Sequence, residues 1–210
     1  MSEIAVEYRP VKNTFDNFQH LYLVYTDNSG KEFTIGGHAV PAFGNPFSRL
    51  VITDNLPLQS SDARDFRENT DVARVERNHL PLNLDGRDPE IVWQQMRLQA
   101  QALSSANIPY DIEALDIAGE SDNSNTTVAS VLNAVGIDLQ ELLPSLRLGN
   151  NDVPGSEDLF SEYADRLNIQ ISGSEDSDII YGGFGDDVIS SLDGDDTDFW
   201  FYASSYSFRF

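Results

Sequence analysis

A run of glycine and aspartate near the C-terminus has the spacing of a calcium-binding turn. Residues 182–190 (Gly-Gly-Phe-Gly-Asp-Asp-Val-Ile-Ser) fit the nine-residue pattern G-G-x-G-x-D-x-U-x, in which U is a large aliphatic residue. The glycines permit sharp turns that present carbonyl oxygens, and Asp187 adds a carboxylate. Because Ca²⁺ takes about six to eight oxygen ligands, we expect it to bind here. The predicted ligands in this repeat are Gly182, Gly183, Gly185 and Asp187.

The flanking nonapeptides, 173–181 and 191–199, keep part of this pattern. Their predicted metal ligands are Gly173, Asp176, Asp178, Gly194 and Asp196. Together the repeats resemble those of the RTX family of secreted calcium-binding proteins. That resemblance implies a short parallel β-helix, or β-roll, that folds as Ca²⁺ binds. The alternative is an acidic, glycine-rich tail without fixed structure; the regular spacing of the aspartates favours the repeat.

Composition narrows the possible partners. The chain has 35 Asp and Glu against 13 Lys and Arg, a formal net charge of −22. This excludes binding of nucleic acid or an anionic membrane through a basic surface, and it favours cations. The chain has no cysteine. Disulfides, zinc–thiolate sites and a cysteine nucleophile are therefore excluded.

A second stretch has residues suited to nucleophilic catalysis. Asn123-Ser124-Asn125 precedes an apolar pattern at helical spacing, so Ser124 lies at a predicted helix N-terminus. Free N–H groups there favour an anion, and the N–H of Ser124 or Asn125 can hold an oxyanion. Serine needs a base to take its proton. The chain offers three histidines, His20, His38 and His79.

The order of these residues resembles that of the circularly permuted papain-like hydrolases, which include the PPPDE peptidases and LRAT-like acyltransferases. The matching stretches are residues 19–25, 31–37 and 123–128. The family nucleophile is cysteine, whereas this position holds Ser124. The resemblance therefore implies that His20 acts as general base. It also implies a polar residue on the next strand that orients His20, and Glu32 is the match.

Each candidate also has a structural interpretation. Asn123 and its neighbours are favoured at helix N-caps without any chemistry. His20 can be a hydrogen-bonded residue at the edge of a core, and Glu32 can be a solvated residue of a hairpin. His38, after two glycines, can lie in a surface loop or approach the same site.

A hairpin and two helices must position the candidates. The sequence predicts an irregular segment at 1–17 and a strand ended by Gly36-Gly37-His38. Asp88-Pro89 and Asn123 begin helices. The predicted strands are 18–26, 31–35 and the neighbourhood of Val51-Ile52, and the helices end before Pro109 and at Gly136. This predicts an α+β domain with an antiparallel sheet over residues 1–163, and a calcium-binding tail over 164–210.

Two functions fit these features. The first is a secreted calcium-binding hydrolase of an amide or ester bond, with a peptide, ubiquitin-like or acyl substrate. The second is a non-catalytic binding or adhesion module on a calcium-folded export tail. No basic region followed by an apolar run stands at the N-terminus, and the RTX resemblance then implies export by type I secretion. The aromatic segment 199–210 fits an export signal or a cap on the last turn.

Overall fold

The computed structural model describes residues 2–11, 18–40, 48–60, 78–110, 123–173 and 175–201, with backbone alone for the last two residues. The C-terminal segment beyond residue 201, predicted as a signal or cap, lies outside these ranges. So does the polar stretch 62–76.

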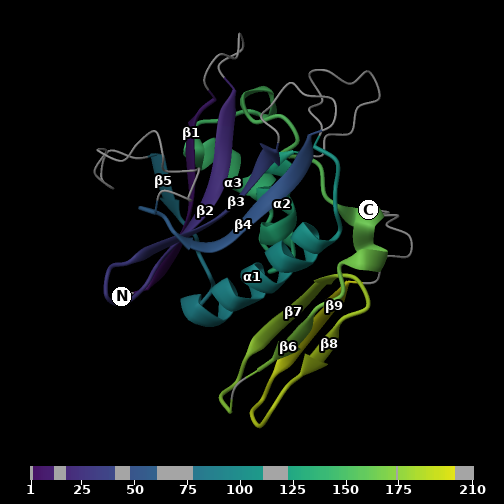
Figure 1. Ribbon diagram of the computed structural model, residues 1–210. Coiled ribbons are helices and arrows are strands. Elements are labelled where there is room, and N and C mark those ends of the chain that lie inside the picture. Colours follow the sequence, from purple (N-terminus) through teal and green to yellow (C-terminus); the bar gives the residue numbers. More distant parts are fainter. Residues whose placement is uncertain are drawn as a thin grey trace, which may run out of the picture.

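A five-stranded antiparallel sheet forms the larger part of the molecule (Figure 1). The strand order is β4-β3-β2-β1-β5, so β2 is central. The strands are β1 (Glu3–Pro10), β2 (Gln19–Thr26), β3 (Glu32–Val40), β4 (Arg49–Pro57) and β5 (Asn78–Pro81). Three helices follow: α1 (Pro89–Ser105), α2 (Ser124–Asn133) and α3 (Leu139–Leu146). The α+β class with an antiparallel sheet is confirmed.

The two faces of the sheet bury different side chains. On β2, Leu21 and Leu23 pack into the main core with residues of α1 and α2. Tyr22 and Val24 alternate with them and form a small separate cluster with Leu58. This alternation is the period of two that strands impose. A side chain on β2 therefore points to the same face of the sheet as the side chains two positions before and after it.

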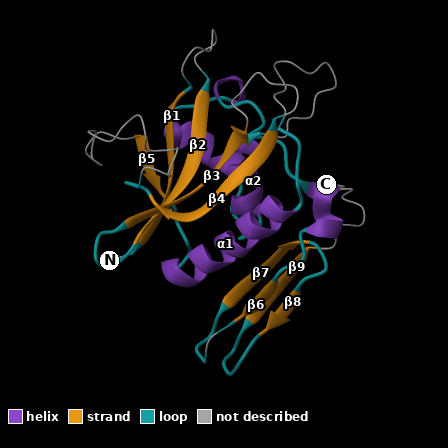
Figure 2. Ribbon diagram, viewed as in Figure 1, coloured by secondary structure: helices purple, strands orange, loops and turns teal. Residues whose placement is uncertain are grey.

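The helices lie against one face of the sheet (Figure 2). α1 packs on β4, and α2 packs on β2 and β3. Asp88 caps α1 by accepting a hydrogen bond from the Glu90 N–H, with proline at the first helical positions, as predicted. None of the helices in the described residues is long and apolar enough to cross a membrane.

The C-terminal strands form two parallel pairs beside α1. Two 3₁₀ turns (Asn150–Asp152 and Ser161–Arg166) lead to β6 (Gln170–Ser172), β7 (Ile179–Phe184), β8 (Val188–Ser190) and β9 (Thr197–Phe201). β6 pairs with β8 and β7 with β9. The pairing joins residues 18 apart, which is two nine-residue repeats, except that Phe184 pairs with Phe201 after a register shift. Ile171 and Ile180 are buried between the strands and α1.

Two element predictions were wrong. The segment predicted as irregular contains β1, whose alternating Ile4 and Val6 enter the main core. β3 continues through Gly36-Gly37-His38 instead of ending there. A side chain on Gly37 would place its Cβ 2.5 Å from Thr127 Oγ1 and 3.1 Å from Ser124 Cα. Gly37 therefore permits the close approach of α2 to the sheet, and it does not terminate the strand.

Candidate functional site

Ser124 is the first residue of α2, and the preceding residue caps the helix. Asn123 Oδ1 accepts hydrogen bonds from Asn125 N–H at 2.7 Å and Thr126 N–H at 3.3 Å. The predicted capping role of Asn123 is thus observed. Because the Asn125 N–H is taken up by this cap, it is not positioned as an oxyanion donor. Ser124 itself is 8% exposed, so it lies below the surface yet is not sealed.

The side chain of Asn125 ties the start of α2 to β2. Its Oδ1 accepts the Leu21 N–H at 2.9 Å, and its Nδ2 donates to Gln19 O at 3.1 Å. β2 pairs with β3 from Leu23 to Thr26. Asn125 bonds the earlier part of β2, which has no such pairing with β3. These two backbone groups flank His20. The residue after Ser124 is therefore bonded on both sides of His20.

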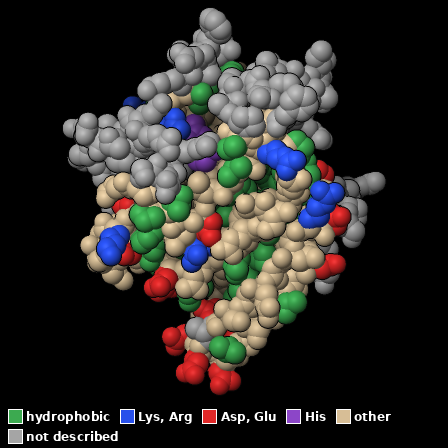
Figure 3. Space-filling model, in the orientation of Figure 1, with side chains coloured by type: hydrophobic (Ala, Val, Ile, Leu, Met, Phe, Trp, Pro, Cys, Tyr) green, Lys and Arg blue, Asp and Glu red, His purple; other side chains and the backbone are tan. Residues whose placement is uncertain are grey.

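His20 lies on the face of β2 that carries Tyr22. The two rings stack with centroids 6.0 Å apart and planes inclined by 25°. The ring of His38, from β3, lies 5.3 Å from that of His20. Both histidines are buried, and histidine side chains are visible at the molecular surface between regions that are not described (Figure 3). Of the two interpretations for His38, a place beside His20 is the one observed.

Glu32 does not reach this site. It is paired with Thr26 at the far end of the hairpin, roughly 20 Å along the strand from His20. Its Oε2 accepts a hydrogen bond from Gln59 Nε2 at 3.5 Å. The orienting role predicted for Glu32 was implied by the family resemblance, which places a polar residue on the next strand. Since β3 continues, His38 occupies the position beside His20 instead.

Tyr110 completes the surroundings of Ser124. Its hydroxyl is hydrogen-bonded to both the side chain and the backbone of Ser124. Burial raises the pKa of Tyr110 above its ordinary value, and these two hydrogen bonds act in the opposite direction. Sequence reasoning missed Tyr110 because it follows α1 in an extended segment, bridged to Arg49 of β4 through Pro109. A pattern read along the chain does not show this contact.

The predicted calcium residues come together in the tail through the pairing of residues 18 apart. The Asp178 N–H donates to Asp196 Oδ1 at 2.8 Å, and the Ile169 N–H donates to Asp187 Oδ1 at 2.9 Å. Two aspartates of the pattern, Asp178 and Asp196, thus lie next to each other at one edge of the tail. At the other edge Asp187 has Ile169, which is apolar, in the corresponding place.

Oxygen atoms lie close to several of the predicted glycines. A Cβ on Gly182 would lie 2.8 Å from Asp187 Oδ2, and one on Gly194 would lie 2.8 Å from the Asp176 carbonyl oxygen. Gly173 and Gly185 likewise face Asp178 Oδ2 and the Leu167 carbonyl oxygen. These carboxylate and carbonyl oxygens are the ligand types that Ca²⁺ takes, so the residues fit the ion chemically. Within the described ranges no three His, Asp or Glu side chains converge, so carbonyl oxygens must complete a site.

Gly183 lies where the tail meets the helices. A side chain there would collide with Gln99 of α1 and the Ala134 side chain at the end of α2. Gln99 Nε2 donates to the neighbouring Gly182 O at 2.8 Å in a buried contact. The lack of a side chain on Gly183 therefore permits docking of the tail on the helices.

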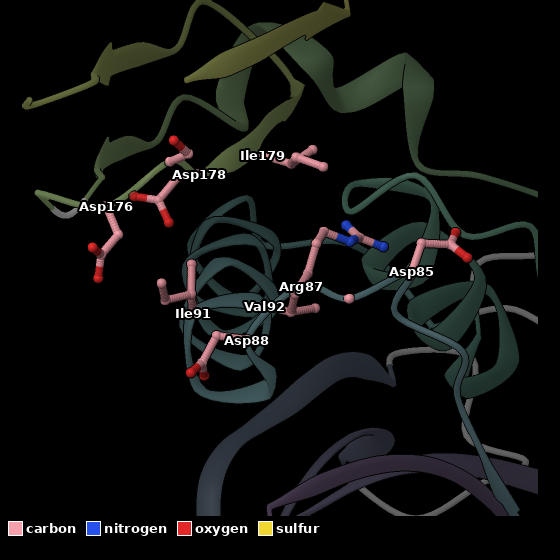
Figure 4. A pocket seen from close by; sticks show the side chains of 10 residues that line it. Asp85, Arg87, Asp88, Ile91, Val92, Asp176, Asp178 and Ile179 are labelled. Carbon is pink, nitrogen blue, oxygen red and sulfur yellow. The ribbon is translucent and has the colours of Figure 1, made fainter. Parts of the chain in front are cut away.

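An acidic cavity of about 300 Å³ lies between the tail and the start of α1. Figure 4 shows Asp176 and Asp178 on the tail side and Asp88 on the helix side, with Ile91 between them. Arg87 lies farther along, and its guanidinium is 5.2 Å from the centre of the Tyr181 ring. Acidic side chains also gather at the tip of the tail (Figure 3). The tail is thus joined to the sheet domain by specific contacts while its acidic loops project outward.

Desolvation changes the titration of one repeat aspartate. Burial raises the pKa of Asp187 to about 6, the Ile169 N–H opposes this shift, and the charge of Asp186 adds to it. A cation bound at this turn would favour the ionised carboxylate.

No protein-family model, curated protein or solved structure matches this chain.

Proposed function

We propose that this protein is a hydrolase of amide or ester bonds in which Ser124 is the nucleophile and His20 the general base. The observation that carries the proposal is the double hydrogen bond of Asn125 to the backbone groups on either side of His20. It holds the first turn of α2 against the strand that carries the base. The resemblance to the permuted papain-like hydrolases supports the same pair of residues.

The proposed reaction begins when His20 takes the hydroxyl proton of Ser124 as Oγ attacks the substrate carbonyl carbon. The carbonyl oxygen becomes an oxyanion, which accepts a hydrogen bond from the Tyr110 O–H. His20 then returns the proton to the leaving amine or alcohol as the acyl–Ser124 ester forms. Water, activated by His20, hydrolyses that ester and restores the enzyme. His38, beside the His20 ring, takes the orienting place first assigned to Glu32.

We further propose that the tail is a short RTX-type β-roll that binds Ca²⁺ and accompanies secretion of the chain by a type I route. The edge formed by Asp178, Asp196 and the Asp176 carbonyl supplies its best oxygen donors, and the edge with Asp187 supplies a second, poorer set. When bound, the ion neutralises carboxylates that otherwise repel one another. The parallel pairing of residues 18 apart supports this part of the proposal.

Activity tests separate a hydrolase from a binding module. Purified wild-type protein would be assayed on nitrophenyl esters of different chain lengths, on peptides and on ubiquitin-like fusions. Ser124→Ala should abolish hydrolysis, and Ser145→Ala, at an exposed position of α3, should not. Equal activity of Ser124→Ala and wild type would reject the hydrolase and leave the binding module as the better account.

Calcium binding has its own test. Circular dichroism with and without millimolar Ca²⁺ should show added β-structure, and isothermal titration should show binding that Asp178→Asn with Asp196→Asn removes. An identical spectrum and no heat on adding Ca²⁺ would reject the calcium-folded tail without bearing on Ser124.

A further inference from the structure

Two other rings lie beside the ring of His20. The plane of His38 is inclined to it by 38°, and Tyr22 stacks on it with an inclination of 25°. Tyr22 is 1% exposed, so its ring has little freedom to leave this position. The ring of Tyr22 thus forms part of the fixed surroundings of His20.

Tyr22 is in turn bonded to a buried ionic cluster. Its hydroxyl donates to Glu7 Oε2 at 2.9 Å. Glu7 is 0% exposed, and its Oε1 lies 2.7 Å from His79 Nδ1. His79 Nε2 lies 2.9 Å from Glu3 Oε1. Both ring nitrogens of His79 therefore face carboxylates, which fits the imidazolium form because it has two N–H donors.

Strand pairing brings Tyr22, Glu7 and His79 side by side. Glu7 is opposite Tyr22 across β1 and β2, and opposite His79 across β1 and β5. All three side chains therefore share the sheet face away from the main core. The ring of His79 gives the buried carboxyl group of Glu7 a hydrogen-bond partner, which offsets the cost of burying it. The phenol of Tyr22 donates to the other oxygen of the same carboxyl group, and a carboxylate acceptor makes the stronger kind of hydrogen bond.

We propose that Tyr22, held by Glu7, is a positioning residue that stabilises the protonated form of His20. The inference rests on the proposed function, in which His20 takes a proton from Ser124. An aromatic face attracts a cation through its quadrupole, and hydrogen bonding of the phenol to a carboxylate increases electron density in the ring. Tyr22 and Glu7 thereby stabilise the His20 imidazolium through a stacked ring, whereas the carboxylate of a Ser-His-Asp triad does so by a direct hydrogen bond.

The other charged groups near His20 make such support necessary. Arg9 is its cross-strand partner on β1, and a neighbouring cation disfavours the imidazolium. His38 lies beside it on β3. Beyond Tyr22 come Glu7 of β1 and His79 of β5, a pair whose charges offset each other. The Tyr22 ring, stacked on that of His20, favours the protonated form.

Titration of His20 tests this without any substrate. The protein would be labelled with ¹³C-histidine, and the three ring signals would be followed by NMR against pH and assigned with His20→Gln and His79→Gln. Tyr22→Phe keeps the stacked ring but removes the bond to Glu7, and Tyr22→Leu removes the ring. The control is Tyr25→Phe, on the same strand but facing Phe33 and Trp93. Circular dichroism would confirm that each variant is folded.

The pKa of His20 should fall by about half a unit in Tyr22→Phe and by about one unit in Tyr22→Leu. It should stay unchanged in Tyr25→Phe. An unchanged His20 pKa in folded Tyr22→Phe would overturn the role of Glu7, and an unchanged value in both variants would overturn the inference entirely. Because the NMR titration needs no turnover, its failure is distinguishable from failure of the hydrolase proposal, which labelling of Ser124 decides.

The rate of Ser124 labelling by a fluorophosphonate, measured against pH, provides the functional readout. If Tyr22 supports the protonated base, the midpoint of this profile should move to lower pH in Tyr22→Phe by the same amount as the His20 pKa. A lower rate at every pH with an unmoved midpoint would show a merely structural role and contradict the proposal.

Discussion

Asn125 Oδ1 accepts a hydrogen bond from the Leu21 N–H at 2.9 Å, between residues more than a hundred positions apart in the chain. A helix N-terminus and the central strand are thereby held together by a side chain that continues the hydrogen bonding of β2 beyond its pairing with β3. The contact fixes the start of α2, where Ser124 lies, against the stretch of β2 that includes His20.

Replacing Asn125 with alanine should destabilise the protein and disturb the site. The change leaves the buried Leu21 N–H without its acceptor and removes the donors to Gln19 O and Pro154 O. The expected loss is about 1–3 kcal/mol of unfolding free energy. Urea unfolding measures it, with Asn133→Ala at the other end of α2 as the control. A midpoint equal to that of the control would show that the contact contributes nothing.

Separate substitutions of His38 and Glu32 should show which of the two orients His20. His38→Gln should slow fluorophosphonate labelling of Ser124 by about tenfold or more, because the ring beside the base is lost. Glu32→Gln should leave the rate unchanged, since Glu32 lies at the far end of the hairpin. The opposite pattern, a slow Glu32→Gln and a normal His38→Gln, would return the orienting role to Glu32.

Docking of the tail should depend on Gln99. Gln99→Leu leaves Gly182 O buried without its donor and should cost about 1–3 kcal/mol of unfolding free energy in the calcium-loaded protein. Gln94→Leu, at an exposed position of the same helix, is the control. Thermal unfolding followed through Trp93 fluorescence, in a Trp200→Phe background that removes the tail's own tryptophan, would report whether the helix domain senses the loss. If both variants unfold together with wild type, the tail docks without help from this bond.

The calcium-free tail should lose stability as the pH rises. Burial raises the pKa of Asp187 from its ordinary value of 3.8 to about 6, so the folded tail binds the proton more tightly than the unfolded chain. The contribution is present in full below about pH 4 and is lost as the pH rises through about 6. Asp187→Asn should flatten this dependence, measured by urea unfolding in EDTA between pH 4.5 and 7. A wild-type stability that rises over this window through the tail transition would contradict the assignment.

Elements that depend on a few adjacent residues could be predicted from the sequence. The Asp88-Pro89 start of α1 and the Asn123 cap of α2 depend on a few adjacent residues, and both predictions are confirmed. β1 was missed because Ile4 and Val6 alternate over only a short stretch before Pro10. The glycines at 36 and 37 were interpreted as a strand end, whereas Gly37 accommodates Ser124 and Thr127 of a distant helix.

The side chains around His20 could be predicted only in part. Ser124 and His20 are suggested by residue type and by position relative to their elements. Glu7, Tyr22 and His79 come together through the order of strands β2-β1-β5, and that order depends on long-range pairing. Glu32 was chosen from the family resemblance, whereas the continuation of β3 through the glycines brings His38 beside His20. A candidate base can therefore be found in a sequence more readily than the residues that orient it.

Covalent labelling of Ser124 tests the central claim most directly. The purified protein would be treated with a fluorophosphonate, digested, and the modified residue located by mass spectrometry, with His20→Gln and Ser145→Ala treated in parallel. We predict a single adduct on Ser124, lost in His20→Gln and kept in Ser145→Ala. Absence of an adduct on Ser124 in the folded, calcium-loaded wild-type protein, or equal labelling in His20→Gln, would contradict a Ser124–His20 catalytic pair.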